Sequence, residues 1–139
     1  MSYSLKVVNG DLSITAGKFD VVSGMDKLKQ DLDCWLVERY RDDRFHPTYG
    51  SILDGYIGGV INAQDTIVRV QSETLRVLSN YQKTQLARFR EFPNKFQPSE
   101  LLQSVNGVNV SLSYDSVIVL VRITTAARTT ASISVGFGV

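Results

Sequence analysis

The spacing of apolar residues changes twice along the chain, and this change limits the possible folds more than any other feature. Residues 4–22 hold short apolar stretches between turn signals, residues 25–39 and 63–89 repeat apolar positions every three or four residues, and residues 105–139 alternate. Alternation is typical of strands, and the wider spacing is typical of amphipathic helices. The pattern predicts an α+β fold with N-terminal β-hairpins, two main helices and a C-terminal three-stranded antiparallel meander.

The N-terminal hairpins are predicted from two turn signals. Asn9-Gly10-Asp11 and Ala16-Gly17-Lys18 interrupt three short apolar stretches. Glycine next to a small or polar residue commonly forms the tight turn between antiparallel strands. Residues 4–22 are therefore expected to form short hairpins.

The first helix is expected to begin after Ser23, a residue type that often caps helices. Its apolar stripe includes Met25, Leu32 and Leu36. At 100° per residue, Cys34 falls roughly opposite this stripe. Cys34 is therefore either exposed or covered by a partner.

The second helix has the clearest pattern in the sequence. Asn62 can cap it, and apolar residues form one face from about Ala63 to Ser79. Gln71 interrupts this apolar face. The helix either ends near Ser79 or continues through Phe89.

The C-terminal segment is predicted to form three antiparallel strands. Residues 105–114 alternate between apolar and polar, residues 117–125 are apolar at nearly every position, and residues 129–139 alternate again. A strand that is apolar throughout is usually the central strand of its sheet. The last strand is then expected at an edge.

This last strand lacks the features that usually protect a sheet edge. Residues 129–139 contain no charged side chain and no proline. Exposed edges normally carry such residues because free N–H and C=O groups recruit other chains. We expect a partner strand to add here and complete the sheet, with the binding positions at Ile133, Val135, Phe137 and Val139. The alternative is that the strand pairs within its own domain, for instance with the N-terminal hairpins.

Composition and charge exclude several classes of partner and cofactor. The chain has 139 residues, with 15 Lys+Arg against 14 Asp+Glu, so its formal net charge is +1. This balance provides no basic surface for nucleic acid or an anionic membrane. A single cysteine cannot form an internal disulfide, and one cysteine with one histidine is too few for a usual structural zinc site. The sequence contains no cofactor motif.

The N-terminal sequence and the lack of linkers bear on location and domain count. The first ten residues do not resemble a secretory signal, and no apolar stretch approaches the roughly 20 residues of a membrane helix. No linker divides the chain. We expect one domain over residues 1–139, with a helical part at about 23–104 and a strand-exchanging sheet at about 105–139.

The residues that could support catalysis are few. His46 is the only imidazole, and loop histidines are usually not catalytic. The carboxylates that could act as a glycosidase pair have no spacing that marks one as acid and one as nucleophile; they are Glu38, Asp42, Asp43 and Asp54. The glycines at 55, 58 and 59 are not followed by the Lys-Ser/Thr of a phosphate-binding loop.

Two motifs together resemble the sheath-initiator family of baseplate wedge proteins in contractile phage tails. The first is Gly24-x-Asp26-x-Leu28-x-Gln30 at a helix start. The second is the loop at residues 46–53, which reads His-Pro-Thr-Tyr-Gly-Ser-x-Leu and is followed by Ile57-Gly58. The resemblance covers roughly residues 11–125. The Glu-Pro-Arg motif often found in the family is absent or rearranged here, since the nearest sequence is Arg90-Glu91-Phe92-Pro93.

The resemblance implies a structural, non-enzymatic role. Members of this family are present in several copies, here expected to be six, around the tail tube, and their C-terminal sheet accepts arms from the first sheath ring. The implied partners are the sheath protein, baseplate wedge proteins and tail tube proteins, and the implied location is the virion tail baseplate, after assembly in the host cytoplasm. Some members carry a lysozyme-like label, so a tail-associated peptidoglycan hydrolase is the alternative function. The residues that match the family motifs are Gly24, Asp26, Gln30, Pro47, Tyr49 and Gly50.

The 46–50 loop is expected to form a rigid corner. Pro47 fixes its own φ near −65° and keeps the preceding His46 extended. Gly50 can adopt a positive φ that other residues avoid. Tyr49 is expected to anchor the corner in the core or on a neighbour.

Overall fold

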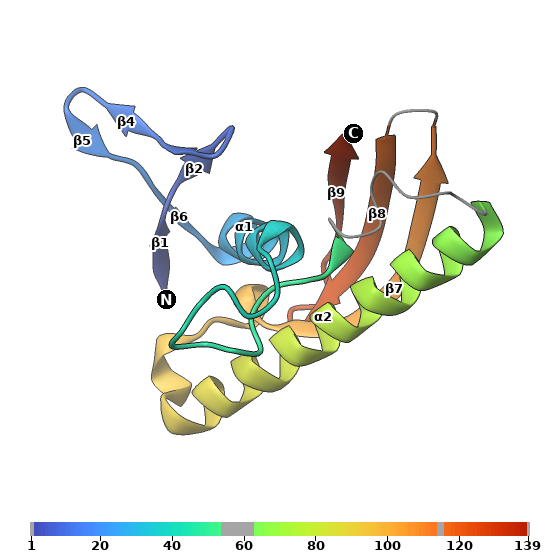
Figure 1. Cartoon of the computed structure of the whole chain (residues 1–139). Helices are drawn as coiled ribbons and strands as arrows, with labels where there is room; N and C mark the ends of the chain where they lie inside the picture. Colours follow the sequence, from blue (N-terminus) through green and yellow to red (C-terminus); the bar gives the residue numbers. More distant parts are fainter. Residues whose placement is uncertain (1, 54–62, 114–115, 139) are drawn as a thin grey trace.

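The computed structural model describes residues 2–53, 63–113 and 116–138. The α+β fold class is confirmed, with a ribbon of short N-terminal strands, two main helices and a C-terminal three-stranded antiparallel sheet (Figure 1). Asp54, the glycines at 55, 58 and 59, the cap position Asn62, and Val139 lie outside the described residues. Among the described residues, no helix is long and apolar enough to cross a membrane.

The N-terminal ribbon projects from the rest of the molecule and is called the arm below (residues 2–23; Figure 1). Its outer pair is β1 (Tyr3–Leu5) with β6 (Val21–Ser23), and its two hairpins are β2 (Val7–Val8) with β3 (Asp11–Leu12) and β4 (Ile14–Thr15) with β5 (Lys18–Phe19). Both predicted turns are present. Asn9 and Gly10 have φ of 52° and 81°, and Ala16 and Gly17 have φ of 50° and 75°, which are the values of type I′ turns.

The three strand pairs of the arm meet at a three-way junction. Lys6 N–H donates to Asp20 C=O, Ser13 N–H donates to Lys6 C=O, and Asp20 N–H donates to Ser13 C=O, each at 2.9 Å. The Asp20 carboxylate also accepts hydrogen bonds from the Ser13 and Thr15 hydroxyls. These bonds satisfy the backbone where no sheet continues, so local hydrogen bonding rather than an apolar core holds the arm in shape.

Both main helices follow the predicted apolar stripes. Helix α1 (Gly24–Val37) begins after Ser23 and buries Leu28, Leu32 and Leu36 at intervals of four residues. Helix α2 (Ala63–Glu91) continues without a break, which confirms the longer of the two expected lengths. Two short 3-10 turns, η2 (Pro93–Lys95) and η3 (Pro98–Glu100), then lead into the sheet.

The C-terminal sheet has the order β7-β8-β9, formed by β7 (Leu102–Leu112), β8 (Ser116–Thr125) and β9 (Thr130–Gly138). The sheet therefore begins three residues before the expected position. The prediction that residues 117–125 form the central strand is confirmed. Their burial alternates, however: the odd-numbered residues are buried, while Ile118 and Leu120 are 44% and 36% exposed.

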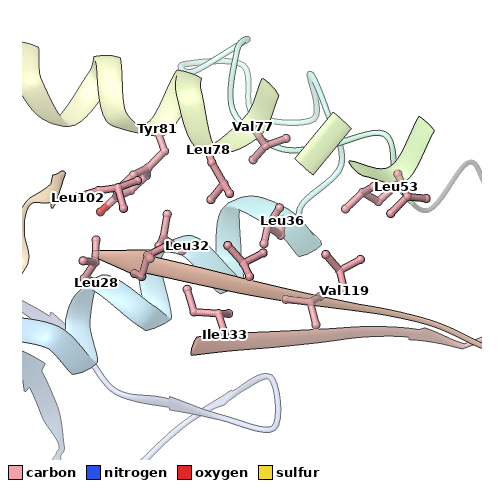
Figure 2. Packing of buried hydrophobic residues seen from close by; sticks show 14 of the residues in the cluster. Leu28, Leu32, Leu36, Leu53, Val77, Leu78, Tyr81, Leu102, Val119 and Ile133 are labelled. Atoms are coloured by element: carbon pink, nitrogen blue, oxygen red, sulfur yellow. The ribbon is translucent and has the colours of Figure 1, made fainter. Parts of the chain in front are cut away.

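The core lies between the sheet and the two helices, which cover one of its faces. Helix α2 packs along β7 and helix α1 packs against β9. Figure 2 shows how side chains from both helices and the sheet meet there, among them Leu32, Leu78, Val119 and Ile133. The buried apolar residues belong to the helices, the sheet and the 50–53 turn, and none of those in the described part of the chain comes from the arm. The opposite face of the sheet is not covered by any part of the chain that the structure describes.

Candidate interaction site

The outer edge of β9 is open within the described residues. Strand β9 pairs with β8 alone, and the N-terminal strands form separate two-stranded sheets. The alternative that the N-terminal hairpins pair with the last strand is therefore wrong. A row of backbone donors and acceptors on β9 therefore has no strand partner among residues 2–53, 63–113 and 116–138.

The β8–β9 turn determines which residues present these groups. Thr125 N–H donates to Thr129 C=O at 2.9 Å, so this opposed pair is a hydrogen-bonded one. Because hydrogen-bonded and non-hydrogen-bonded pairs alternate along an antiparallel ladder, Ile133 and Val135 direct their backbone groups toward β8. The residues between them direct theirs toward the open edge; they are Ser132, Ser134 and Gly136.

The side chains of the predicted binding positions point into this chain's own core. Ile133 and Val135 are 6% and 3% exposed, and Phe137 is partly buried against the same cluster. Val139 lies outside the described residues. What β9 offers to a partner is the backbone of Ser132, Ser134 and Gly136, whose small or absent side chains lie on the uncovered face of the sheet.

The Gly24 motif residues fix the start of helix α1 and the arm. Gly24 has a φ of +60°, and its backbone amide helps to lower the pKa of Glu100. Asp26 lies in the first turn, where its negative charge interacts favourably with the helix dipole and stabilises the helix. Gln30 binds the arm with both ends of its amide: its Oε1 accepts from Val7 N–H at 2.9 Å, and its Nε2 donates to Leu5 C=O at 2.8 Å.

Glu100 is a buried carboxylate that joins distant parts of the chain. Its oxygens accept hydrogen bonds from the Ser2 N–H and hydroxyl and from the Gln97 N–H. Burial by itself would raise the pKa of Glu100, but the hydrogen bonds from Ser2, Gln97 and Gly24 lower it below its ordinary value. Sequence reasoning missed this residue, although the Gln97-x-x-Glu100 spacing is that of a capping box.

The corner at residues 46–50 is confirmed as a tightly constrained turn. Gly50 has a φ of +94°, and a Cβ built there would lie 2.6 Å from the Arg39 carbonyl oxygen and 2.7 Å from that of Glu38. No residue with a side chain fits without moving the backbone. The next residue continues the close contact, since Ser51 N–H donates to Glu38 C=O and its hydroxyl donates to Leu36 C=O.

Tyr49 is half-buried and packs this corner against helix α1. Its ring packs edge-on against Trp35 with 4.8 Å between the centroids, and Trp35 contacts Tyr81 in the same way. Burial, with smaller contributions from Cys34 and nearby carboxylates, raises the pKa of Tyr49 to about 12. Pro47 lies in the exposed part of the loop.

The catalytic candidates do not assemble into a recognisable active site. His46 Nδ1 lies 2.9 Å from Asp43 Oδ2 on the surface, and no nucleophile in the described part of the chain hydrogen-bonds the imidazole. The hydrogen bond with His46 and one from Phe45 N–H lower the pKa of Asp43, which is the wrong direction for a general acid. Cys34, Asp43 and His46 line one hollow of about 610 Å³. Burial and nearby carboxylates raise the pKa of the Cys34 thiol, so the reactive thiolate is disfavoured.

A metal site is likewise not formed by the described residues. They contain no group of three histidine, cysteine or acidic side chains that could hold an ion. The remaining candidates, Glu38 and Asp42, are exposed. The most distinctive feature of the described chain is therefore the open edge of β9.

Comparisons with known proteins bear on the fold. No protein-family model and no curated protein sequence matches the chain. A solved structure does: the crystal structure of a Geobacter sulfurreducens protein, provisionally described as a tail lysozyme, aligns with 86% of this chain and 96% of that chain. The TM-score is 0.62 at 13% sequence identity. The two proteins share a fold.

Proposed function

We propose that this protein is a structural component of the baseplate of a contractile phage tail and that it initiates sheath assembly by β-strand exchange. In this role it docks on baseplate wedge proteins, is present in six copies around the tail tube, and accepts a strand from the first sheath ring at the outer edge of β9. The protein acts as a template rather than an enzyme. Its location is the virion tail, after assembly in the host cytoplasm.

The single observation that carries this proposal is the open edge of β9. Backbone hydrogen bonds to an exposed edge supply affinity in strand addition, and a three-stranded sheet gains stability when a strand is added. The fold shared with a protein described as a tail lysozyme supports the link to phage tails. Among phage tail proteins, the motifs at residues 24–30 and 46–53 favour the sheath-initiator family.

Proline at Ser134 tests the edge directly. The Ser134 N–H faces the open edge, so Ser134→Pro removes no hydrogen bond to any residue that the structure describes, and proline is tolerated at such edge positions. The variant should keep its circular dichroism spectrum and lose at least 100-fold in affinity for the sheath subunit purified from the tail that carries this protein. Deleting residues 129–139 would be a poorer test, because Ile133 and Val135 belong to the core.

Serine-to-alanine substitution at the same position is the matched control. Ser134→Ala changes the side chain on the uncovered face and leaves the backbone N–H in place. Its affinity should stay within about twofold of the wild type. Unchanged sheath binding by a folded Ser134→Pro variant would disprove strand addition at β9.

The second candidate function is peptidoglycan hydrolysis, which the description of the structural neighbour favours. It requires two carboxylates in different environments. Purified protein should clear a peptidoglycan suspension if this function is correct, and Asp43→Asn should abolish the clearing. We expect no clearing, because the lowered pKa of Asp43 disfavours it as the general acid that this reaction requires.

A further inference from the structure

A groove of about 720 Å³ lies directly beside the open edge of β9. One wall is formed by residues 132–134 of β9, and the floor by the face of α1 that carries Asp26, Lys29 and Asp33. The other wall belongs to the arm, through Lys6 and Val7 and through residues 21–23 of β6. A strand added next to β9 would lie about 5 Å from it, within this groove.

We propose that the arm is the second wall of the strand-binding site, so that an incoming strand is held between β9 and the arm. This inference rests on the proposed function, and it adds a second surface that the open edge alone does not provide. The occupant is an extended strand of a neighbouring subunit. Its backbone pairs with Ser132, Ser134 and Gly136, and its apolar side chains contact Val7 and Val21.

The exposed apolar residues of the arm support this arrangement. Val7 and Val21, which line the groove, are 38% and 58% exposed. The arm carries further large exposed apolar side chains and buries none of its own in the core; they are Tyr3, Leu5, Val8, Leu12, Ile14 and Phe19. Large apolar side chains left exposed in this number suit an interaction surface better than a solvated one.

The arm is also held in place before any partner binds. Gln30 fixes Leu5 and Val7 to helix α1 through two hydrogen bonds. At the start of the chain, Ser2 is fixed by the buried Glu100. A groove whose walls are already positioned costs a partner less ordering on binding.

The floor of the groove determines which side chains of the incoming strand can face α1. Lys29 and Asp33 make no ion pair or side-chain hydrogen bond with any residue that the structure describes. They can pair with charged groups of opposite sign on the incoming strand. The groove therefore fits a strand that is polar toward α1 and apolar toward the arm.

Two arm substitutions of equal exposure test the second wall. Val21 lines the groove and Ile14 does not, and their exposed fractions are 58% and 59%. In the full-length protein, Val21→Asp should weaken binding of the purified sheath subunit at least tenfold, whereas Ile14→Asp should stay within twofold. Val21→Thr, which keeps the β-branched shape, should fall between them and guards against a folding defect in the aspartate variant.

The outcomes separate this inference from the proposed function. If Ser134→Pro abolishes binding and Val21→Asp does not weaken it, the arm is not a wall of the site, while strand addition at β9 stands. Equal weakening by Val21→Asp and Ile14→Asp would also overturn the inference, because the effect would not depend on the groove. If a folded Ser134→Pro variant binds as well as the wild type, the proposed function itself is wrong.

Discussion

The two outer edges of the C-terminal sheet are treated in opposite ways. The β7 edge is covered by amide side chains of helix α2: Gln71 donates to Val108 C=O, and Gln82 donates to the carbonyl groups of Leu102 and Gln103. The β9 edge has no such cover in the described chain, although α1 packs against the same strand. Its edge-facing residues are Ser132, Ser134 and Gly136.

This difference shows that the fold can cover a sheet edge with side chains, so the open β9 edge needs another explanation. The same fold places glutamines three helical turns apart on α2 so that they follow β7, since residues 71 and 82 are separated by about 1,100° of rotation and share a face. Natural sheets generally protect their edges against unwanted pairing. A chain that protects one edge and leaves the other bare has one edge available for a partner.

The largest expected effect comes from the buried amide at the start of the covered edge. Gln85 is 8% exposed, accepts from Leu102 N–H at 2.8 Å and donates to Glu100 C=O at 2.6 Å. Gln85→Leu keeps most of the volume but leaves both backbone groups buried without a partner. Each such group costs about 1–3 kcal/mol, so we expect the free energy of unfolding in urea to fall by about 3 kcal/mol.

The open edge supplies the control for this experiment. Ser134→Ala removes a side chain that makes no hydrogen bond in the described chain, and the free energy of unfolding should change by less than about 0.5 kcal/mol. Similar losses from Gln85→Leu and Ser134→Ala would mean that the two edges do not differ in the way described.

The next effect is a pH dependence that centres on Glu100, two residues before β7. Its pKa in the folded protein lies below its ordinary value of 4.5, so the folded state binds this proton less readily than the unfolded chain does. The stabilisation from Glu100 is therefore complete above the ordinary pKa and is lost as the pH falls through the lower, folded value. Urea unfolding between pH 7 and pH 2.5 should show this loss.

Glu100→Gln isolates the contribution of this carboxylate. At pH 7 the variant should be less stable by about 2 kcal/mol, which is typical of hydrogen bonds to a charged group. The difference from the wild type should shrink as the pH falls below 4. A constant difference across the whole pH range would show that the charge of Glu100 does not stabilise the fold.

Much of the fold could be predicted from the sequence because the local signals agree with the tertiary packing. The turn residues at Asn9-Gly10 and Ala16-Gly17 place two hairpins, and the apolar stripe of α1 matches its buried leucines. The central position of β8 follows from its apolar residues. The positive φ at Gly50, predicted from its place in the corner, is also confirmed.

The remaining features depend on contacts between segments that are far apart in the sequence. Gln71 looked like an interruption of an apolar stripe, but it caps a carbonyl group 37 residues away. Glu100 has little local signal beyond its capping box, and its main partners include Ser2, which is 98 residues away. The exposed Ile118 and Leu120 show that an apolar strand does not require cover on both faces within its own chain.

A smaller effect is expected at the exposed part of the covered edge. Gln82→Ala removes the donor for the carbonyl groups of Leu102 and Gln103, which water can partly replace, so the free energy of unfolding should fall by about 1 kcal/mol. Lys83→Ala, next to it on the solvent side of α2, is the control and should have almost no effect. If the Lys83 variant loses as much stability as the Gln82 variant, the loss does not come from capping of the β7 edge.

The finest test of the comparison needs no substitution. Along β9, the amides of Ile133 and Val135 bond to β8, whereas those of Ser132, Ser134 and Gly136 face the open edge. Amide hydrogen exchange should therefore alternate between slow and fast along this strand, because only the first group must open the sheet to exchange. Addition of the sheath subunit should slow the exchange of the second group selectively. Uniformly slow exchange along β9 in the isolated protein would mean that its outer edge is already paired in solution, and the contrast between the two edges would not hold.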